Sequence, residues 1–274
     1  MDVKIEKITP ELAQEYLKRN AVNRKPSQLR INAFAYDMQH GAWQLNGEAI
    51  RFDSSGNLRD GQHRLYAIAK SGVPIEICVM RGIDDSVSIY DRGRSRSTYD
   101  ALIISGFDKD LANNVNVAVA KLHYSIQLNQ TFVSDYLVEL FIKNHAETLR
   151  NLSPISGKNH HKSSANLSTK SASLILACLY AIESGEDLND IFDFCKVYRT
   201  GLVENRNQSA AIVCRNDVIG NNIRMTGSSA LRIKAEFVFE KGIYDFCQKY
   251  PRTKTYKNVN KPTYSNNLIF KEVI

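Results

Sequence analysis

Two periodicities of apolar and polar positions run along the chain, and the change between them divides it into two parts. In the N-terminal part, short runs with a period near two predict strands, and longer runs with a period near 3.6 predict helices. The predicted order is a strand at 3–9, a helix at 10–20, a helix at 27–41, a hairpin at 47–60, a helix at about 62–70 and a strand at 74–80. This order is typical of a small mixed α/β unit.

From residue 98 onward the pattern is helical. Segments with one apolar and one polar face are joined by short turns, and they lie at 98–105, 110–128, 134–152, 169–185, 187–201 and 228–250. A polar, serine-rich stretch at 153–169 lacks this period and is predicted to be a loop. We therefore predict an α+β protein, with a mixed-sheet domain at 1–100, an all-helical domain at 101–250 and a basic tail at 251–274.

The basic tail contains Tyr256 and Tyr264 among its lysines. Basic residues with interleaved aromatic rings are one way to contact nucleic acid. A solvated and poorly ordered chain end is the more common outcome for such a segment, and it is the interpretation favoured here.

Composition places the chain among globular proteins. Of its 274 residues 43% are hydrophobic and 24% are charged, and no apolar run approaches the length of about 18 residues that a membrane span needs. The five cysteines are odd in number and too widely spaced for a metal or redox pair, so we expect reduced thiols packed in a core. These features predict a cytoplasmic protein without a membrane partner.

The charge balance adds a weak indication of a polyanionic partner. Lysine and arginine number 36 against 29 aspartate and glutamate, which gives a net charge of +7. A positive surface attracts nucleic acid, yet many basic proteins bind none, so the charge alone does not decide the function.

The most informative segment is Asp60-Gly61-Gln62-His63-Arg64, a polar turn between a predicted strand and a predicted helix. Such a turn places backbone N–H groups and the positive end of the helix dipole on the same side, which favours phosphate. Gly61 allows a close approach of the backbone, Arg64 supplies a cationic fork, His63 can carry a proton, and Asp60 can hold a cation or accept a proton. In the structural alternative, Asp60 caps the helix and pairs with Arg64.

The segment from about Asn23 to Arg81, which holds this turn, resembles the N-terminal domain of the ParB/sulfiredoxin superfamily. The shared features are the order of elements and a G-x-x-R turn opening a helix, here Gly61 to Arg64. The resemblance is strongest to the DGQHR-bearing branch found among phage and mobile-element proteins. It covers about a quarter of the chain.

This resemblance implies a site for ATP or CTP with Mg²⁺, in which Gly61, His63 and Arg64 contact phosphates. The expected cofactor-binding residues are Arg24, Gly61, Gln62, Arg92, Arg94 and Arg96. The chain departs from two branches at the same position. Sulfiredoxin has its catalytic cysteine where this chain has Gln62, which argues against sulfinic acid reduction. Chromosome-partitioning ParB has Glu-Arg in place of Gln62-His63, and no helix-turn-helix is evident beyond the turn.

The three arginines from Arg92 to Arg96 lie around Gly93, directly before a predicted helix. They are interpreted as a second phosphate-binding element, with an exposed basic loop as the alternative. Trp43, near the first strand of the hairpin, is interpreted as a core residue, and lining the site is the alternative.

Two classes of function remain open. The first is an enzyme, an NTPase or phosphotransferase acting on or with nucleic acid, with Asp60, His63 and Arg64 as catalytic residues and Asp60 as a ligand of Mg²⁺. The second is a DNA-binding or nuclease-like module without NTP turnover. A homodimer is compatible with both, since the helical half could serve dimerisation or substrate binding.

Overall fold

The computed structural model describes residues 1–20, 23, 25–84, 97–104, 106–108, 110–128, 132–156, 171–219 and 229–264. Contacts divide the chain into two compact units. The first comprises Met1–Ser95 together with the segment Phe132–Tyr136, and the second comprises Arg96–Thr131 and Leu137–Ile274.

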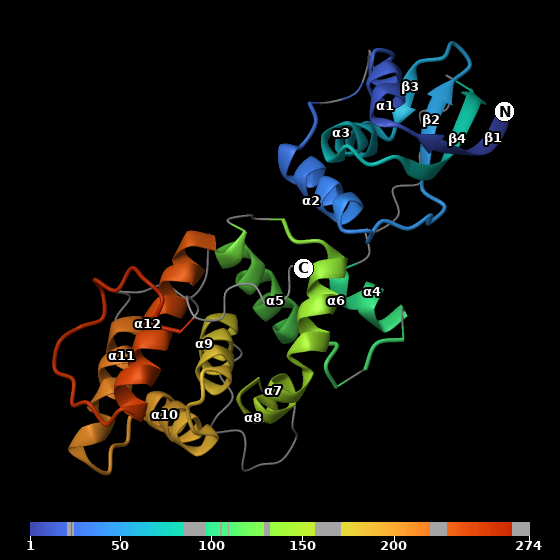
Figure 1. The fold of residues 1–274 in the computed structure, drawn as a ribbon. Coiled ribbons are helices and arrows are strands. Elements are labelled where there is room, and N and C mark those ends of the chain that lie inside the picture. Colours follow the sequence, from blue (N-terminus) through green and yellow to red (C-terminus); the bar gives the residue numbers. More distant parts are fainter. Residues whose placement is uncertain are drawn as a thin grey trace. The chain divides into compact units, whose positions relative to one another are not determined.

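The first unit contains a small mixed sheet with helices packed against it (Figure 1). Its elements in order are β1 (Asp2–Ile8), α1 (Pro10–Leu17), α2 (Gln28–Gln39), β2 (Ala49–Asp53), β3 (Leu58–Asp60), α3 (Gln62–Ser71) and β4 (Ile75–Ile83). Within the described residues the strand order is β1-β4-β2-β3, with β2 parallel to β4 and the other neighbours antiparallel. The element order predicted for the N-terminal part is thus confirmed.

Local chemistry explains where these elements begin and end. Thr9 caps α1 by accepting a hydrogen bond from the Leu12 N–H, and Pro10 occupies the first turn, where its missing N–H costs nothing. Gly61 and Gly72 stand at the two ends of α3, both with positive φ. In β4 alternate residues from Ile75 to Val79 are buried, which is the pattern of a strand with one covered face.

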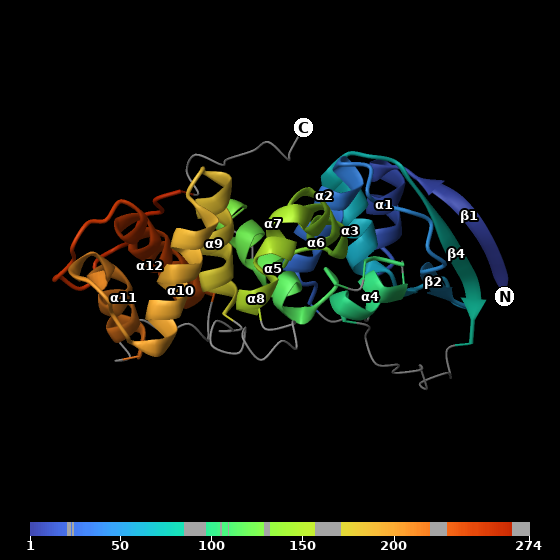
Figure 2. The same ribbon diagram turned by 90° about the horizontal axis from the view of Figure 1, so that it is seen from below.

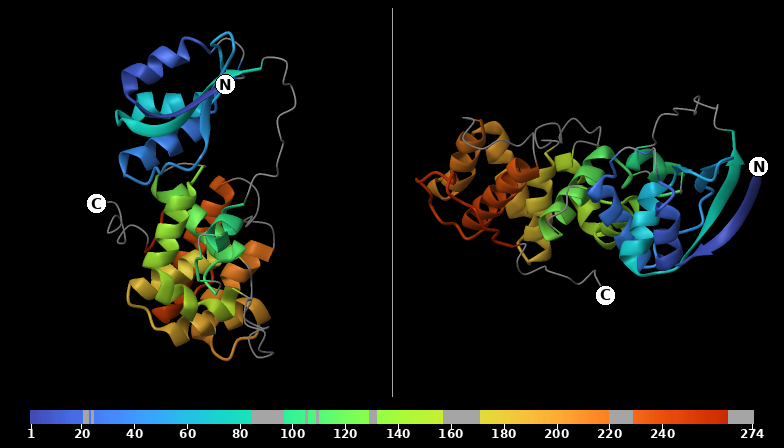
Figure 3. Two further views of the ribbon diagram at one scale, coloured as in Figure 1. Left: turned by 90° about the vertical axis from the view of Figure 1, so that its right-hand side faces the viewer. Right: turned by 90° about the horizontal axis from the view of Figure 1, so that it is seen from above.

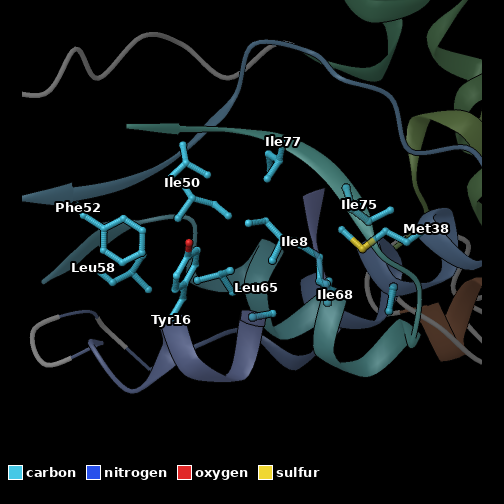
Figure 4. Close-up of a cluster of buried hydrophobic side chains, with 14 residues drawn as sticks. Ile8, Tyr16, Met38, Ile50, Phe52, Leu58, Leu65, Ile68, Ile75 and Ile77 are labelled. Atoms are coloured by element: carbon cyan, nitrogen blue, oxygen red, sulfur yellow. The ribbon is translucent and has the colours of Figure 1, made fainter. Parts of the chain in front are cut away.

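The core of the first unit lies between the sheet and its helices. Figure 4 shows Ile8, Ile50 and Ile77 of the strands facing Leu65 and Ile68 of α3. Tyr16 of α1 meets Phe52 edge to face, with ring centroids 5.1 Å apart. This packing fixes α3, and therefore the turn at its start, against the sheet.

The long antiparallel pair of β1 and β4 is visible side by side in Figure 2. At one end of this pair Arg81 of β4 forms an ion pair with Glu6 of β1 and donates a hydrogen bond to the Tyr16 hydroxyl at 2.7 Å. The bond from Arg81 holds the pKa of Glu6 below its usual range, although partial burial acts in the opposite direction. The edge strand is therefore joined to both β4 and α1.

All the secondary-structure elements described in the second unit are helices. Its elements are α4 (Thr98–Ile104), α5 (Asn114–Gln127), α6 (Asp135–Asn144), α7 (Ala146–Asn151), α8 (Ser153–Ser156), α9 (Ala172–Glu183), α10 (Leu188–Thr200), η1 (Arg206–Gln208), α11 (Ser209–Ile219) and α12 (Ser229–Cys247), although α6 begins within the segment assigned to the first unit. Helix α9 is buried on all sides from Ser173 to Ala181, and it packs against α5 and α12 (Figure 3). A helix that is apolar all round belongs at the centre of a bundle.

The structure differs from the helical prediction in three places. Helix α8, Ser153–Ser156, begins the stretch at 153–169 that is predicted to be a loop, and the rest of that stretch lies outside the described residues. The run at 134–152 is interrupted at His145, which adopts a non-helical conformation and separates α6 from α7. Helix α11 was not predicted, because its buried residues include Ala210, Ala211 and Asp217 and its apolar positions form no clear stripe.

The expectation that the C-terminal segment is a solvated end is wrong for its described part. Up to residue 264 it packs on the helical unit, with Tyr256 fully buried and Tyr264 only 4% exposed. The Tyr256 N–H donates to Asp217 at 2.5 Å and its hydroxyl donates to Asp245 at 3.0 Å. Both tyrosine rings therefore serve the core of the second unit.

The fold is α+β, with a small mixed sheet followed by a helical region, as predicted. None of the helices in the described part of the chain is both long and apolar enough to span a bilayer. Four of the cysteines are buried and Cys78 is partly buried. Burial raises the pKa of the Cys214 thiol well above its usual range, which suits the expected packing role.

Candidate functional site

The DGQHR turn, residues Asp60 to Arg64, joins β3 to α3. Gly61 has φ +99°, and a Cβ added there would lie 3.0 Å from the Ile50 Cα and 3.1 Å from its Cγ1. Only glycine fits, because both the backbone conformation and the space exclude a side chain. The structure shows that this glycine lets the turn pack on β2, and the approach of a ligand at the same residue stays a prediction.

Arg64 lies between two carboxylates. Its guanidinium contacts Glu48 at 3.1 Å and Asp60 at 3.2 Å, and the arginine is only 9% exposed. Asp60 also accepts a hydrogen bond from the Gly61 N–H at 2.7 Å. Of the structural alternative for the turn, the pair between Asp60 and Arg64 is present, but Asp60 does not cap α3, because the N-cap residue is Gly61 and no side chain caps the helix. Glu48 is a second partner of Arg64 that the sequence did not indicate.

His63 joins the DGQHR turn to the start of α2. Its Nε2 accepts a hydrogen bond from the Ser27 N–H at 2.9 Å. Ser27 is the N-cap residue of α2 as predicted, but its side chain makes no capping hydrogen bond. The accepting nitrogen carries no proton in this arrangement, so any proton that His63 exchanges here is carried on Nδ1.

Gln62 is placed differently from the other residues of the turn. It is 6% exposed, and its Oε1 accepts a hydrogen bond from Asn20 at 3.2 Å. This contact ties the start of α3 to the end of the α1 region. The Gln62 side chain thus acts in the packing of the turn.

A cavity of about 760 Å³ opens beside the turn within the first unit. Asp60, Gly61, His63 and Arg64 form one part of its wall. The size is in the range of sites for small molecules and cofactors. We call this space the DGQHR cavity.

Helix α2 and the loop after it form another part of the wall. They contribute Arg30, Phe34, Asp37, Trp43 and Glu48, and the segment 132–136 of the same unit closes the lining. Phe34 and Trp43 meet edge to face, with ring centroids 5.5 Å apart, and both pack against the core. Trp43 therefore fits both interpretations given for it, because it packs on the core and lines the cavity.

Asp37 is the most unusual group in the DGQHR cavity. It is 9% exposed, and its Oδ1 is buried without a hydrogen-bond partner among the described residues. Burial raises the pKa of Asp37 to about 6, a hydrogen bond from Ser134 lowers it, the Asp135 carboxylate raises it and His40 lowers it. Burying the ionised Asp37 carboxylate therefore lowers the stability of the folded state.

Four of the expected residues lie outside the described residues, namely Arg24, Arg92, Arg94 and Arg96. The structure brings together Asp60, Gly61, His63 and Arg64 on one cavity wall. Asp37, Phe34 and Glu48 were missed. A signal for two of them existed, because Arg30, Phe34 and Asp37 fall at i, i+4 and i+7 of one predicted helix and so share a face.

The resemblance implies a magnesium ion, so the side chains at the cavity should include oxygen donors that can bind it. Among the described residues no group of three or more acidic, histidine or cysteine side chains is arranged to hold a metal. Asp60 and Glu48 are nevertheless two hard oxygen donors at the cavity wall, with side chains 49% and 64% exposed. This set fits Mg²⁺ bound jointly by carboxylates, phosphate and water, which is its usual mode in nucleotide sites.

Comparison of the chain with protein-family models, with curated proteins and with solved structures gave no match in any of the three. The site is therefore interpreted from its own residues and geometry.

Proposed function

We propose that the first unit binds a nucleoside triphosphate, ATP or CTP with Mg²⁺, in the DGQHR cavity, and that the protein uses it as an NTPase or phosphotransferase acting on or with nucleic acid. The observation that carries the proposal is the cavity of about 760 Å³ at the start of α3, with Arg64, His63 and Asp60 on its wall. The resemblance of residues 23–81 to the phage and mobile-element branch of the ParB/sulfiredoxin superfamily points the same way.

The contacts of Arg64 suggest how such a site would work. Glu48 and Asp60 orient the guanidinium, and both carboxylates are exposed enough to move. Glu48 and Asp60 would hold Mg²⁺, and Arg64 would neutralise phosphate. Mg²⁺ would supply charge stabilisation for the reacting phosphoryl group.

The remaining groups of the turn have matching roles in this proposal. The N-terminus of α3 offers its dipole to an anion, and His63 keeps the turn in place through Ser27. Asp60 is the proposed catalytic carboxylate, because it lies on the cavity wall and is about half exposed. It would position the attacking hydroxyl or water.

The test measures binding and turnover together. Calorimetry with each common ribonucleoside triphosphate and Mg²⁺ should give saturable binding, and phosphate release or label transfer should follow with or without DNA. Arg64→Ala should weaken binding at least tenfold, because it removes the phosphate-facing cation. Lys70→Ala is the matched control, since it removes an exposed cation from the opposite end of the same helix. Absence of binding with every triphosphate would refute the proposal.

A nuclease-like module without NTP turnover is the second candidate. The observation that favours it is the pair of carboxylates, Glu48 and Asp60, at an open cavity in a chain of net charge +7. Metal-dependent cleavage of a phosphodiester needs such donors. Cleavage of single- or double-stranded DNA with Mg²⁺, lost in Asp60→Asn and independent of added triphosphate, would favour this candidate over the first.

A further inference from the structure

We propose that the DGQHR cavity recognises the base of its nucleotide through Asp37, which accepts a hydrogen bond from the exocyclic amino group of adenine or cytosine. This inference rests on the proposed function, because it assigns the base end of the same site. It adds a specificity-determining residue and a chemical class of base.

The first step is the missing partner of Asp37. Asp37 lines the cavity, and its Oδ1 is buried and has no hydrogen-bond partner among the described residues. A buried polar atom without a partner is costly, and an ionised carboxylate can only accept hydrogen bonds. The group that completes this site is therefore a donor, and the cavity is the space from which it would come.

The second step is the aromatic wall. Phe34 and Trp43 line the cavity, with ring centroids 5.5 Å apart at an angle of 72°. Both rings pack against the hydrophobic core, so their positions are fixed before a ligand arrives. Rigid aromatic faces of this kind are the usual surface on which a nucleobase stacks.

The third step is the spacing along α2. Hydrogen bonds join Ser27 to His63 at the start of α2 and α3, and Gln39 to Ser71 at their ends, so the two helices run in the same direction. The DGQHR turn therefore lies beside the start of α2. Asp37 is seven residues beyond Arg30 on the same face, which is roughly 10 Å along the helix. Cationic groups at one end and an acceptor at the other match a nucleotide lying along α2.

The fourth step selects the base. Ser134 already donates to the Asp37 carboxyl, so one oxygen remains for one donor. Adenine and cytosine each present a single amino group beside a ring acceptor. Uracil presents carbonyl oxygens around its N–H, and these would repel a carboxylate. Guanine also carries an exocyclic amino group that can donate to this oxygen, so its exclusion rests on the proposed function, which names ATP or CTP.

The experiment compares triphosphates that differ by one amino group. Calorimetry measures ATP against purine riboside triphosphate, and CTP against the triphosphate of the pyrimidin-2-one riboside, each with Mg²⁺. The wild-type protein should bind the better of ATP and CTP at least tenfold more tightly than its analogue. Asp37→Ala, which removes the acceptor, should lose this difference, and Asp135→Ala, which removes another carboxylate from the same cavity, should keep it.

The outcomes separate the inference from the proposed function. If the analogues bind as tightly as ATP and CTP and Asp37→Ala changes nothing, the inference is overturned while nucleotide binding stands. If none of the triphosphates binds, both are overturned. Circular dichroism of each variant excludes misfolding as the cause of a lost preference.

Discussion

Each unit of the protein buries a carboxyl group with a raised pKa, and the two groups differ in what surrounds them. Asp37 of the first unit lies on the wall of the DGQHR cavity, and burial raises its pKa to about 6. Glu236 of the second unit is fully buried within α12, and burial followed by the nearby Glu240 carboxyl raises its pKa well above the usual range. Asp37 therefore lies at a cavity, whereas Glu236 lies beside a second carboxyl group, that of Glu240.

This difference shows how a carboxyl group with a raised pKa should be interpreted. Glu236 can remain protonated next to Glu240, whose Oε2 accepts hydrogen bonds from the Thr263 and Tyr264 N–H groups, so its environment serves the packing of the C-terminal segment. Glu236 and Asp37 both have buried oxygens without a hydrogen-bond partner among the described residues, but Asp37 lines the DGQHR cavity and Glu236 does not. A raised pKa alone does not identify a binding site, whereas a raised pKa with an accessible space does.

The largest expected effect is on the stability of the first unit, and it comes from a substitution at Gly61 in the cavity wall. Gly61→Ala should lower the free energy of unfolding by about 3 kcal/mol, because a strained φ adds to the close contact with Ile50. Gly72→Ala is the matched control at the other end of α3. It also has positive φ, but its added Cβ would meet nothing within 4 Å, so it should cost only about 1 kcal/mol.

Urea titration followed by tryptophan fluorescence measures both variants, because the only tryptophan, Trp43, lies in the first unit. Equal losses in the two variants would show that the contact with Ile50 does not shape the turn.

The next largest effect is a gain in stability of the second unit. Glu236→Gln should raise its free energy of unfolding by about 2 kcal/mol near pH 8, since the wild-type chain must protonate or bury a charge on folding. The folded pKa is raised, so the stability contributed by the native acid is full below the ordinary value of 4.5 and declines as the pH rises. The gain should therefore shrink toward pH 4. Far-UV circular dichroism follows this helical unit, and a loss of stability at pH 8 would contradict the assignment.

A smaller gain is expected for Asp37→Asn in the first unit. The folded pKa of Asp37 is about 6 against an ordinary 3.8, so the native group costs stability as the pH rises from about 4 to 6. Replacing the carboxylate removes this cost and should stabilise the first unit by about 1 to 2 kcal/mol above pH 7. The gain is no larger because the buried amide leaves its own polar atoms partly unsatisfied. Below pH 4 the gain should vanish.

The measurement is urea titration at several pH values with Trp43 emission. A gain that does not depend on pH would show that Asp37 is not a desolvated carboxylate. Together with reduced nucleotide selectivity, a pH-dependent gain would identify Asp37 as a group that lowers stability in favour of binding.

The sequence predicts the first unit well, because its signals are local. The cap at Thr9, the alternation in β4 and the glycines around α3 each act within a few residues, so the element order could be inferred. The position of the DGQHR turn between a strand and a helix followed from the same signals.

The rest of the site depends on contacts between distant residues. Glu48 reaches Arg64 only because β2 lies beside the turn. The pKa of Asp37 is raised by burial and by the Asp135 carboxylate, which is distant in the sequence, while a hydrogen bond from Ser134 lowers it. The close approach of Gly61 to Ile50 could not be inferred from the turn itself, since Ile50 comes from another strand. The burial of Tyr256 likewise depends on Asp217 and Asp245, which no pattern in the tail could reveal.

The most direct measurement of the central claim is a titration of Trp43 fluorescence with ATP and CTP in the presence of Mg²⁺, with inorganic tripolyphosphate as the control. Trp43 is the only tryptophan and lines the DGQHR cavity, so a base that stacks beside it should change its emission in a saturable way. Tripolyphosphate should compete for the site without producing this change. Nucleotide binding detected by calorimetry with no change in Trp43 emission would contradict the account, because the base would then lie elsewhere.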